Sequence, residues 1–256
     1  MSNQRIKYIT LILFMSFPFL VLGQGKITRN QSSQNKTTTF TKFSVSGAIN
    51  GHDYVDLGLS SGTLWATNNI GANTPAGYGN YFAWAETKSK KVYSKENCTT
   101  YNTRMYFDGL PSNIKSDTIR AMLRIIDNPK YDAARANWGE GWQLPSSADF
   151  AELNKECIWQ YMTIDGHNGY KITGPNGNSV FLPMAGYIEE TYKSQVGTGG
   201  FYWTGDFCDD TRSIMFDFHK SSHDGIIWSN RQNGKSIRPV LRDRKPKNTI
   251  KWANEL

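Results

Sequence analysis

The chain has 256 residues, of which 38% are hydrophobic, 13% aromatic and 20% charged. This composition excludes a disordered chain, a collagen-like repeat and a membrane protein with many spans. The 29 basic and 22 acidic residues are unevenly distributed, because residues 46–241 hold 18 basic and 20 acidic residues and the positive excess lies near the two ends. A nucleic-acid-binding protein needs its positive charge gathered on a folded face, so no nucleic-acid partner is expected.

Residues 1–23 have the pattern of a secretory signal peptide. Arg5 and Lys7 precede an apolar run over residues 8–22. This run is shorter than the roughly 20 residues that a membrane-spanning helix needs. We therefore expect an exported protein, located in the periplasm, at the cell surface or outside the cell, with no membrane span after cleavage.

The remaining chain divides into three parts. Residues 24–45 are rich in Ser, Thr, Asn, Gln and Lys and indicate a flexible polar linker. Residues 46–241 contain short apolar segments separated by turns, which is typical of one folded domain, and residues 242–256 form a basic tail. The three cysteines are Cys98, Cys157 and Cys208. Three thiols cannot all pair within one chain, and their spacing leaves open whether any of them do.

Two helices are predicted. The first begins at Ser116 and ends before Pro129, and its apolar stripe has the i, i+3, i+4, i+7 spacing of a helix face. That stripe consists of Ile119, Met122, Leu123 and Ile126. The second begins at Ser146, where Asp149 supplies the acid of a capping box. Its apolar face consists of Phe150, Leu153 and Cys157.

Most other apolar segments are short and bounded by turn residues, as strands are. These segments are 54–59, 63–67, 81–85, 169–173, 179–183, 201–205, 213–218, 225–229 and 236–240. The Asn-Gly pair within residues 174–178 predicts a hairpin turn. Helices that precede a long run of strands indicate an α+β domain with an antiparallel sheet.

Three blocks of sequence resemble one known family. They are VDLGLSSGTLWATNNIGANTPAGYGNYFAWAET at 55–87, YDAARANWGEGWQLPSSADFAEL at 131–153, and FYWTGDF at 201–207 with NRQNGKSIRPV at 230–240. Together they resemble the Fibrobacter succinogenes major paralogous domain, which is found mostly in exported proteins of gut and rumen bacteria. The resemblance implies a C-type-lectin-like fold with two helices, an antiparallel sheet and long loops, a fold shared with formylglycine-generating enzymes.

The resemblance also implies roles for single positions. Residues 236–240 look like a closing strand that returns beside the entry strand at 54–57, which would make Arg238 a structural residue. Family members often carry Cys where this chain has Asn68, and if that position is bridged to the one of Cys157 elsewhere in the family, this chain has lost the bridge.

Residues 186–235 correspond to the exposed face that contacts partners in the lectin-like relatives. In this chain, aromatic rings stand among carboxylate and amide side chains, a mixture that suits a glycan or protein ligand. The candidate ligand-binding residues are Tyr187, Tyr192, Tyr202, Asp206, Phe207, Asp209, Trp228, Asn230, Arg231 and Asn233. Trp203 and Trp228 each lie inside an apolar segment, which favours core positions for both rings.

No cofactor is expected, and calcium is the alternative. His219 and His223 are four residues apart, but their segment reads as strand, turn and strand, so the two imidazoles need not converge. The carboxylates of Asp206, Asp209 and Asp210 could supply oxygen ligands for calcium, although their spacing is not that of an EF-hand.

Catalysis has little support. Glu189 or Glu190 could pair with Asp206 as in a glycosidase, but adjacent residues of a strand point to opposite faces. Formylglycine-generating enzymes use a closely placed cysteine pair near the carboxyl terminus, where this chain has only Cys208.

The sequence therefore predicts an exported, non-catalytic recognition module that binds a glycan or a protein. Two exposed rings would contribute only about 5 kcal/mol, against an association cost of at least about 4 kcal/mol. Adhesion would therefore need several contacts or multivalent display. A structural subunit of a surface assembly is the alternative, a glycan-active enzyme is third, and the oligomeric state is left open.

Overall fold

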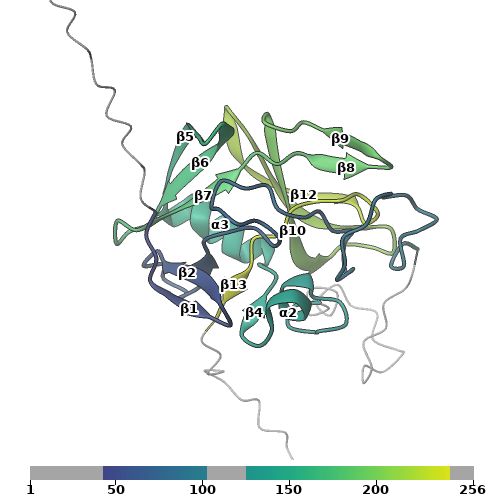
Figure 1. Cartoon of the computed structure of the whole chain (residues 1–256), viewed down its shortest axis with the longest axis horizontal. Helices are drawn as coiled ribbons and strands as arrows, with labels where there is room; N and C mark the ends of the chain where they lie inside the picture. The colour runs from purple at the N-terminus through teal and green to yellow at the C-terminus, as the bar shows by residue number, and fades with distance from the viewer. Residues whose placement is uncertain (1–42, 103–124, 243–256) are drawn as a thin grey trace, which may run out of the picture. The chain divides into compact units, whose positions relative to one another are not determined.

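The computed structural model of the protein describes residues 43–102 and 125–242. Segments from the beginning and the end of this part meet in one five-stranded antiparallel sheet with the order β1-β2-β3-β13-β4 (Figure 1). Its strands are β1 (Gly47–Ile49), β2 (His52–Asp56), β3 (Leu64–Ala66), β13 (Val240–Leu241) and β4 (Trp142–Gln143). Val240 of β13 pairs with Trp65 on one side and with Gln143 on the other. The last strand of the domain therefore lies inside the sheet.

The position of this closing strand corrects one expectation. Residues 236–240 were expected beside 54–57, but β3 lies between β13 and β2. Arg238 explains the arrangement, since its buried guanidinium donates to the carbonyl oxygens of Ala66 (3.1 Å), Thr67 (2.7 Å) and Phe181 (2.9 Å). These bonds hold the final segment against the end of β3, which is the structural role expected for Arg238.

Helix α3 (Ser147–Glu156) begins where the sequence predicts it. The Ser146 hydroxyl accepts a bond from the Asp149 backbone N–H (3.3 Å), and the Asp149 carboxylate accepts one from the Ser146 N–H (2.6 Å). This capping box satisfies N–H groups that have no partner inside the helix. Phe150 and Leu153 are fully buried on the inner face.

A second, shorter helix was not predicted. It is α2 (Ala133–Trp138), and the carboxylate of its N-cap residue Asp132 accepts two backbone N–H groups of the first turn. The helix predicted from Ser116 falls mainly outside the described residues, and its described end at residues 126–127 is a turn. Neither described helix is long and apolar enough to cross a membrane.

Residues 158–183 form a three-stranded antiparallel sheet. It consists of β5 (Ile158–Ile164), β6 (His167–Thr173) and β7 (Ser179–Pro183). The predicted hairpin turn joins β6 to β7, and Gly177 adopts φ 85°, which a glycine accommodates without strain. The coarse prediction of an α+β domain with antiparallel sheets agrees with the structure.

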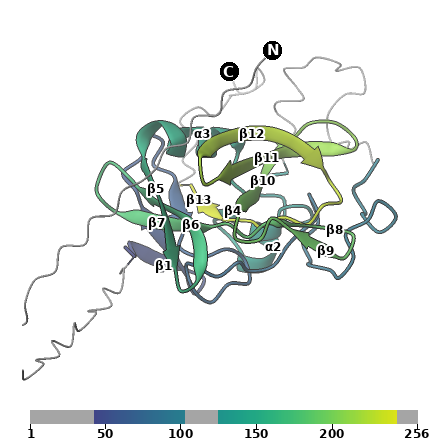
Figure 2. The same cartoon turned by 90° about the horizontal axis from the view of Figure 1, so that it is seen from above.

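The remaining strands hold most of the predicted binding residues. They are β8 (Tyr187–Glu189), β9 (Tyr192–Ser194), β10 (Gly199–Phe207), β11 (Arg212–His219) and β12 (Ser222–Asn230). β8 and β9 form a hairpin, and β10-β11-β12 form a sheet in which β12 is an edge strand (Figure 2). Residues 81–85 were predicted as a strand but form only an isolated bridge between Phe82 and Lys235.

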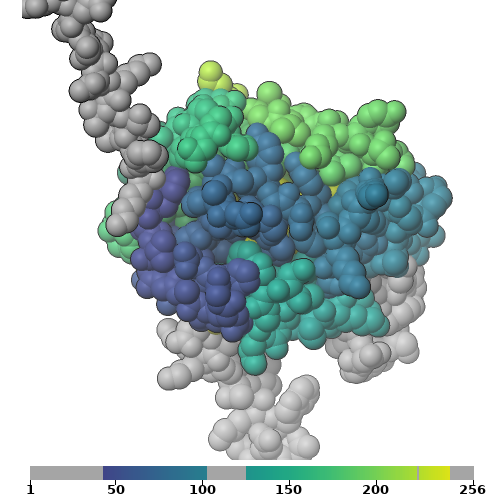
Figure 3. Space-filling view, viewed as in Figure 1, coloured from purple at the N-terminus to yellow at the C-terminus, as the bar shows by residue number. Residues whose placement is uncertain are grey.

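Alternate residues of β10 and β11 belong to two different hydrophobic clusters. Phe201, Trp203 and Met215 pack in one cluster, while Tyr202 and Phe216 pack in the other beside α3. Strands that are buried on both faces lose the polar alternation of a surface strand. Residues 67–102, blue in Figure 3, spread over the middle of one face of the domain.

Candidate functional site

The predicted binding residues lie on a composite sheet. Besides β10-β11-β12, it includes residues 234–236, which form bridges from Gly234 to Ile188 of β8 and from Ser236 to Tyr202 of β10. The order across the sheet is therefore β8, residues 234–236, β10, β11 and β12. This sheet brings the predicted residues into one region, but it does not turn all of their side chains to the surface.

Four of the predicted residues lie in the interior, namely Tyr202, Arg231, Asn233 and, as described below, Asp206. Tyr202 is fully buried and donates its hydroxyl to the Pro183 carbonyl (2.8 Å). Arg231 is fully buried as well, and Asn233 is 7% exposed. A side chain that is enclosed by the fold does not meet an external ligand, so these four are corrected to core positions.

Arg231 connects two loops through hydrogen bonds to their backbone. Its guanidinium donates to the carbonyl oxygens of Thr100 (2.8 Å) and Asp209 (2.5 Å). Its guanidinium carbon also lies 4.7 Å from the ring centroid of Trp84 and 5.0 Å from that of Phe207. Phe207 is half-buried in this contact, which gives it a packing role.

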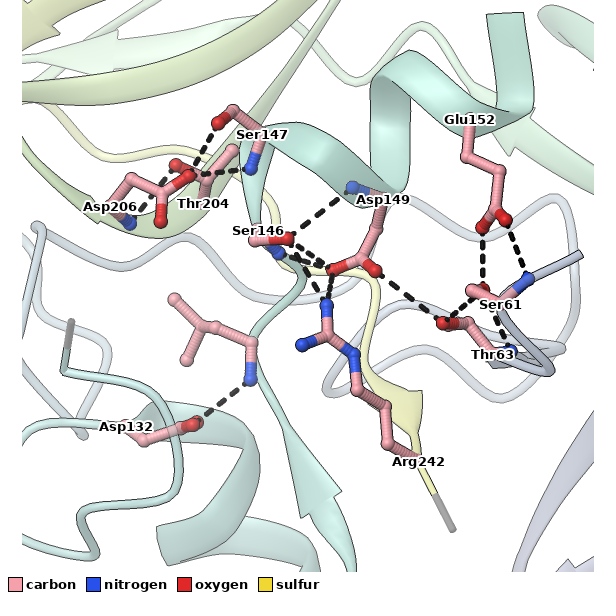
Figure 4. Close-up of polar contacts among 11 residues, drawn as sticks. Ser61, Thr63, Asp132, Ser146, Ser147, Asp149, Glu152, Thr204, Asp206 and Arg242 are labelled. Carbon is pink, nitrogen blue, oxygen red and sulfur yellow. Dashed lines mark hydrogen bonds and ion pairs between the residues drawn. The ribbon is translucent and has the colours of Figure 1, made fainter. Parts of the chain in front are cut away.

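Asp206 is bound to the start of α3 (Figure 4). Its carboxylate accepts bonds from the backbone N–H (2.6 Å) and the hydroxyl (2.5 Å) of Ser147. A carboxylate at a helix N-terminus is stabilised by the unpaired N–H groups there. Beside it, Arg242 pairs with Asp149, so the predicted tail residue Arg242 is part of the fold. This polar cluster ties strands and helix together and leaves Asp206 little room to contact a ligand.

A second polar group does face the solvent. The Asp209 carboxylate accepts bonds from the Arg212 Nε (2.6 Å) and backbone N–H (2.7 Å) and from the Thr211 backbone N–H (2.9 Å). Partial burial acts to raise the pKa of Asp209, but the bonds from Arg212 and Thr211 outweigh it and hold the pKa at about 2. Asp209 is therefore ionised at neutral pH, and Arg212 is fixed in place.

Arg212 in turn covers an exposed tryptophan. Its guanidinium carbon lies 4.3 Å from the centroid of the Trp228 ring, and half of Trp228 is exposed. Asn230 stands opposite Arg212 in the strand register and is half-buried. The expectation that Trp228 belongs to the core is wrong, whereas Trp203 is fully buried as expected.

The exposed surface of β12 is apolar as well as aromatic. Ile226 and Trp228, on the same face of β12 as Asn230, are 42% and 50% exposed, and Ile227 on the opposite face is 47% exposed. β12 pairs with β11 on one side, and no described strand pairs with its other side. We refer to Asp209, Arg212, Ile226, Trp228 and Asn230 as the β12 patch.

The two tyrosines of the β8–β9 hairpin form a separate group. Tyr192 is 75% exposed, while Tyr187 is half-buried and packs edge-on against Phe201 at 5.1 Å. Since β8 and β12 are at opposite ends of the composite sheet, these tyrosines do not join the β12 patch.

The histidines and carboxylates do not form a metal centre. His219 lies near Asp217 (3.6 Å), whereas His223 stacks on Trp159 at 4.7 Å. Within residues 43–102 and 125–242, no group of three or more His, Cys, Asp or Glu side chains is placed to hold a metal ion. No disulfide joins the three cysteines to one another.

Lys235 is not a candidate in the sequence, because it stands in the polar, glycine-containing segment that precedes the predicted strand 236–240. Its side chain is only 1% exposed, and its Nζ lies 4.5 Å from the Trp203 ring centroid and 5.3 Å from that of Tyr187. Burial lowers the pKa of Lys235 to about 7, although the carboxylates of Glu189 and Asp217 oppose this shift.

Comparisons with known proteins found nothing similar: no family model matches the chain, and no curated protein or solved structure gave a significant match.

Proposed function

We propose that this protein is an exported, non-catalytic recognition module with a C-type-lectin-like fold, and that it binds its ligand through the β12 patch. The observation that carries the proposal is the pair formed by Arg212 and the exposed ring of Trp228, with Asp209 fixing the guanidinium. The meeting of early and late strands in one sheet and the long irregular segment 67–102 support the lectin-like fold.

The patch is arranged before a ligand binds. A free arginine side chain loses about 2 kcal/mol of rotamer entropy when it is fixed, and Arg212 is already held by two contacts. Trp and Arg are also the residue types that dominate binding energy at protein interfaces. A ligand that covers about 100 Å² of apolar surface here would gain about 2.5 kcal/mol.

The composition of the patch favours a protein over a glycan. Arg212 lies over one face of the Trp228 ring, so that face is not open for stacking against a sugar. Ile226 adds aliphatic surface beside Trp228, which suits apolar side chains better than sugar hydroxyls that require hydrogen-bond partners. A protein ligand is therefore our first choice, and a glycan is the second.

The same patch also supports the alternative function, a structural subunit of a surface assembly. An edge strand with unpaired backbone groups and consecutive apolar residues pairs readily with another chain. A permanent partner on β12 would use the same residues as a transient ligand.

Binding tests the proposal. Residues 24–256, displayed as a multimer, are applied to peptide and glycan arrays together with the Trp228→Ala and Arg212→Ala variants. Ile158→Ala is the matched control, because Ile158 is 74% exposed on β5, which belongs to a different sheet. We expect the first two variants to lose binding and the control to keep it.

Cross-linking in the producing cells separates the two functions. A partner that is attached at all times through β12 supports the assembly, whereas a monomer that captures a soluble ligand supports recognition. Binding that survives both patch substitutions would contradict the use of this patch.

A further inference from the structure

β12 is a long edge strand whose outer side is available for pairing. It has nine residues and pairs with β11 on one side, and no other described strand pairs with its outer side (Figure 2). Proteins usually protect such an edge with proline, with charged residues or by keeping the strand short. Residues 225–230 contain neither proline nor a charged residue. Within the described part of the chain, this stretch of β12 therefore lacks the usual protection against a further strand.

A hydrogen bond at the end of β12 shows which backbone groups point outward. The backbone N–H of Arg231 donates to the Thr211 carbonyl on the β11 side (3.0 Å). In an antiparallel pair, successive residues direct their N–H and C=O groups alternately towards the neighbouring strand and away from it. The register places Ile227 in phase with Arg231, so its backbone groups face β11. The backbone groups of Ile226 and Trp228 therefore face the outer edge.

The apolar residues of this edge match a second copy of the same strand. A two-fold axis at Ile227 pairs Ile226 of one copy with Trp228 of the other, and the symmetry repeats this pair. These residues have outward backbone groups, and each such pair exchanges two N–H···O=C bonds. Ile227 then lies opposite its own copy in a pair without backbone bonds, where side chains approach most closely. Each of the three exposed apolar residues thus gains an apolar neighbour.

Charge favours this register over the two next to it. An axis at Trp228 would place the two Trp228 rings side by side and bring together the two Arg212 guanidinium groups that cover them. Like charges at paired positions are destabilising. An axis at Ile226 would place Trp228 opposite residue 224, which is acidic. With the axis at Ile227, each ring under Arg212 gains an aliphatic neighbour instead.

The domain as a whole also permits self-association through β12. Residues 46–241 hold 18 basic and 20 acidic residues, so two copies approach without strong repulsion. The edge strand of comparable length, β5, is less suited to an apolar contact. Two of its three exposed residues, Gln160 and Thr163, are polar, and only Ile158 is apolar.

We propose that the protein forms a two-fold dimer in which β12 pairs antiparallel with β12 of a second copy, with Ile227 on the axis. The two three-stranded sheets then become one sheet of six strands. The axis is perpendicular to this sheet, so the β12 patches of both copies lie on the same face. The dimer itself does not depend on a ligand, whereas its use as a double binding surface rests on the proposed function. Two adjacent patches would supply the several contacts that a weak single site needs.

Sedimentation of residues 24–256 over a hundredfold range of concentration tests the dimer. One strand pair covers less area than the roughly 1,200–2,000 Å² of a stable interface, so we expect a dimer that dissociates on dilution. Ile227→Lys should raise the midpoint concentration at least tenfold, because it places two ammonium groups opposite each other. Ile158→Lys is the matched control, since it makes the same change at an exposed position of β5 and should leave the midpoint unchanged.

A charge exchange tests the register. An equimolar mixture of Ile227→Lys and Ile227→Asp should dimerise at least tenfold more tightly than either variant alone, because opposite charges meet only if residue 227 faces its own copy. No gain in the mixture would overturn the proposed register.

Three results would overturn the dimer. They are a wild-type protein that sediments as a monomer at every concentration, a dimer that Ile227→Lys leaves intact, and a dimer that Ile158→Lys dissociates. Ile227 lies on the face opposite the β12 patch, so its substitution leaves the proposed ligand contacts in place. An intact wild-type dimer that binds nothing on the arrays would therefore contradict the proposed function and not the dimer.

Discussion

The guanidinium carbon of Arg212 lies 4.3 Å from the centroid of the Trp228 ring, and the Asp209 carboxylate holds it there through a 2.6 Å bond to Nε. Arg212 at the start of β11, Trp228 on β12 and Asp209 in the turn before β11 thus form one ordered surface, in which the carboxylate fixes the guanidinium over the ring. This relationship leads to the first two predictions.

Asp209→Asn should weaken ligand binding about tenfold, which corresponds to about 1.4 kcal/mol. The amide lacks the charge that fixes Arg212, while the free energy of unfolding should change by only about 1 kcal/mol because the ion pair is partly exposed and solvent screens it. Titration of the multimeric protein with its ligand measures the effect. Asp165→Asn, in the exposed turn between β5 and β6, is the control and should bind normally. Equal binding by both variants would show that Asp209 is not needed.

The Asp209 carboxylate should titrate near pH 2. Its pKa in the folded protein is about 2, below the ordinary value of 3.8, so the stabilisation from its hydrogen bonds is complete above pH 3.8 and is lost as the pH falls towards 2. The chemical shift of the Asp209 carboxyl carbon, followed by NMR against pH, measures the midpoint. A midpoint near 3.8 would mean that the bonds from Arg212 and Thr211 do not persist in solution.

Lys235→Met should increase the stability of the protein at pH 7. The pKa of Lys235 in the folded state is about 7 and its ordinary value is 10.5, so between these values the unfolded chain binds a proton that the folded chain has released. The stability of the wild-type protein should therefore rise with pH between 7 and 9. Urea unfolding at several pH values measures the slope. In the Lys235→Met variant, the unfolding free energy should no longer rise with pH in this range. An equal rise in both proteins would mean that groups other than Lys235 cause it.

Arg238→Met should destabilise the domain by about 3–5 kcal/mol, because it removes a fully buried cation from a set of buried acceptors. Arg212→Met has the same change of side chain at an exposed position and should cost less than about 1 kcal/mol. Urea unfolding compares the two variants. Similar losses of unfolding free energy in the two variants would show that the burial of Arg238 is not the reason for its contribution to stability.

Asp206→Ala should lower the stability by about 1–3 kcal/mol and leave ligand binding intact in the folded fraction. The reason is that Asp206 accepts two bonds from Ser147 at the start of α3. Thermal unfolding and ligand titration on the same sample separate the two effects. If the variant lost ligand binding and kept its stability, Asp206 would be a ligand-binding residue and not a structural one.

The sequence predicted the parts of the fold that depend on local chemistry. The capping box from Ser146 to Asp149 and the hairpin turn at 174–178 both have their signal within a few residues, and both are confirmed. Strand order has no local signal. Trp203 and Trp228 occupy similar apolar segments, but β10 has neighbours on both sides and β12 is an edge, so one ring is buried and the other is half exposed.

The candidate site was harder to predict for the same reason. Tyr202, Arg231 and Asn233 lie in polar or aromatic segments that look exposed, but the strands beside them bury their side chains. Conversely, Lys235 looks like a turn residue and lies in the interior because residues 234–236 pass between β8 and β10. Whether each of these side chains is exposed or buried depends on a strand that is distant in the sequence.

The place of β13 between β3 and β4 has a consequence for how the protein is made. A nascent chain on the ribosome lacks the strand that joins β3 to β4 in this sheet until residues 240–241 have been synthesised. Contacts between residues so far apart in sequence also form slowly, since a long loop must close first. The five-stranded sheet is therefore completed only after nearly the whole described domain has left the ribosome.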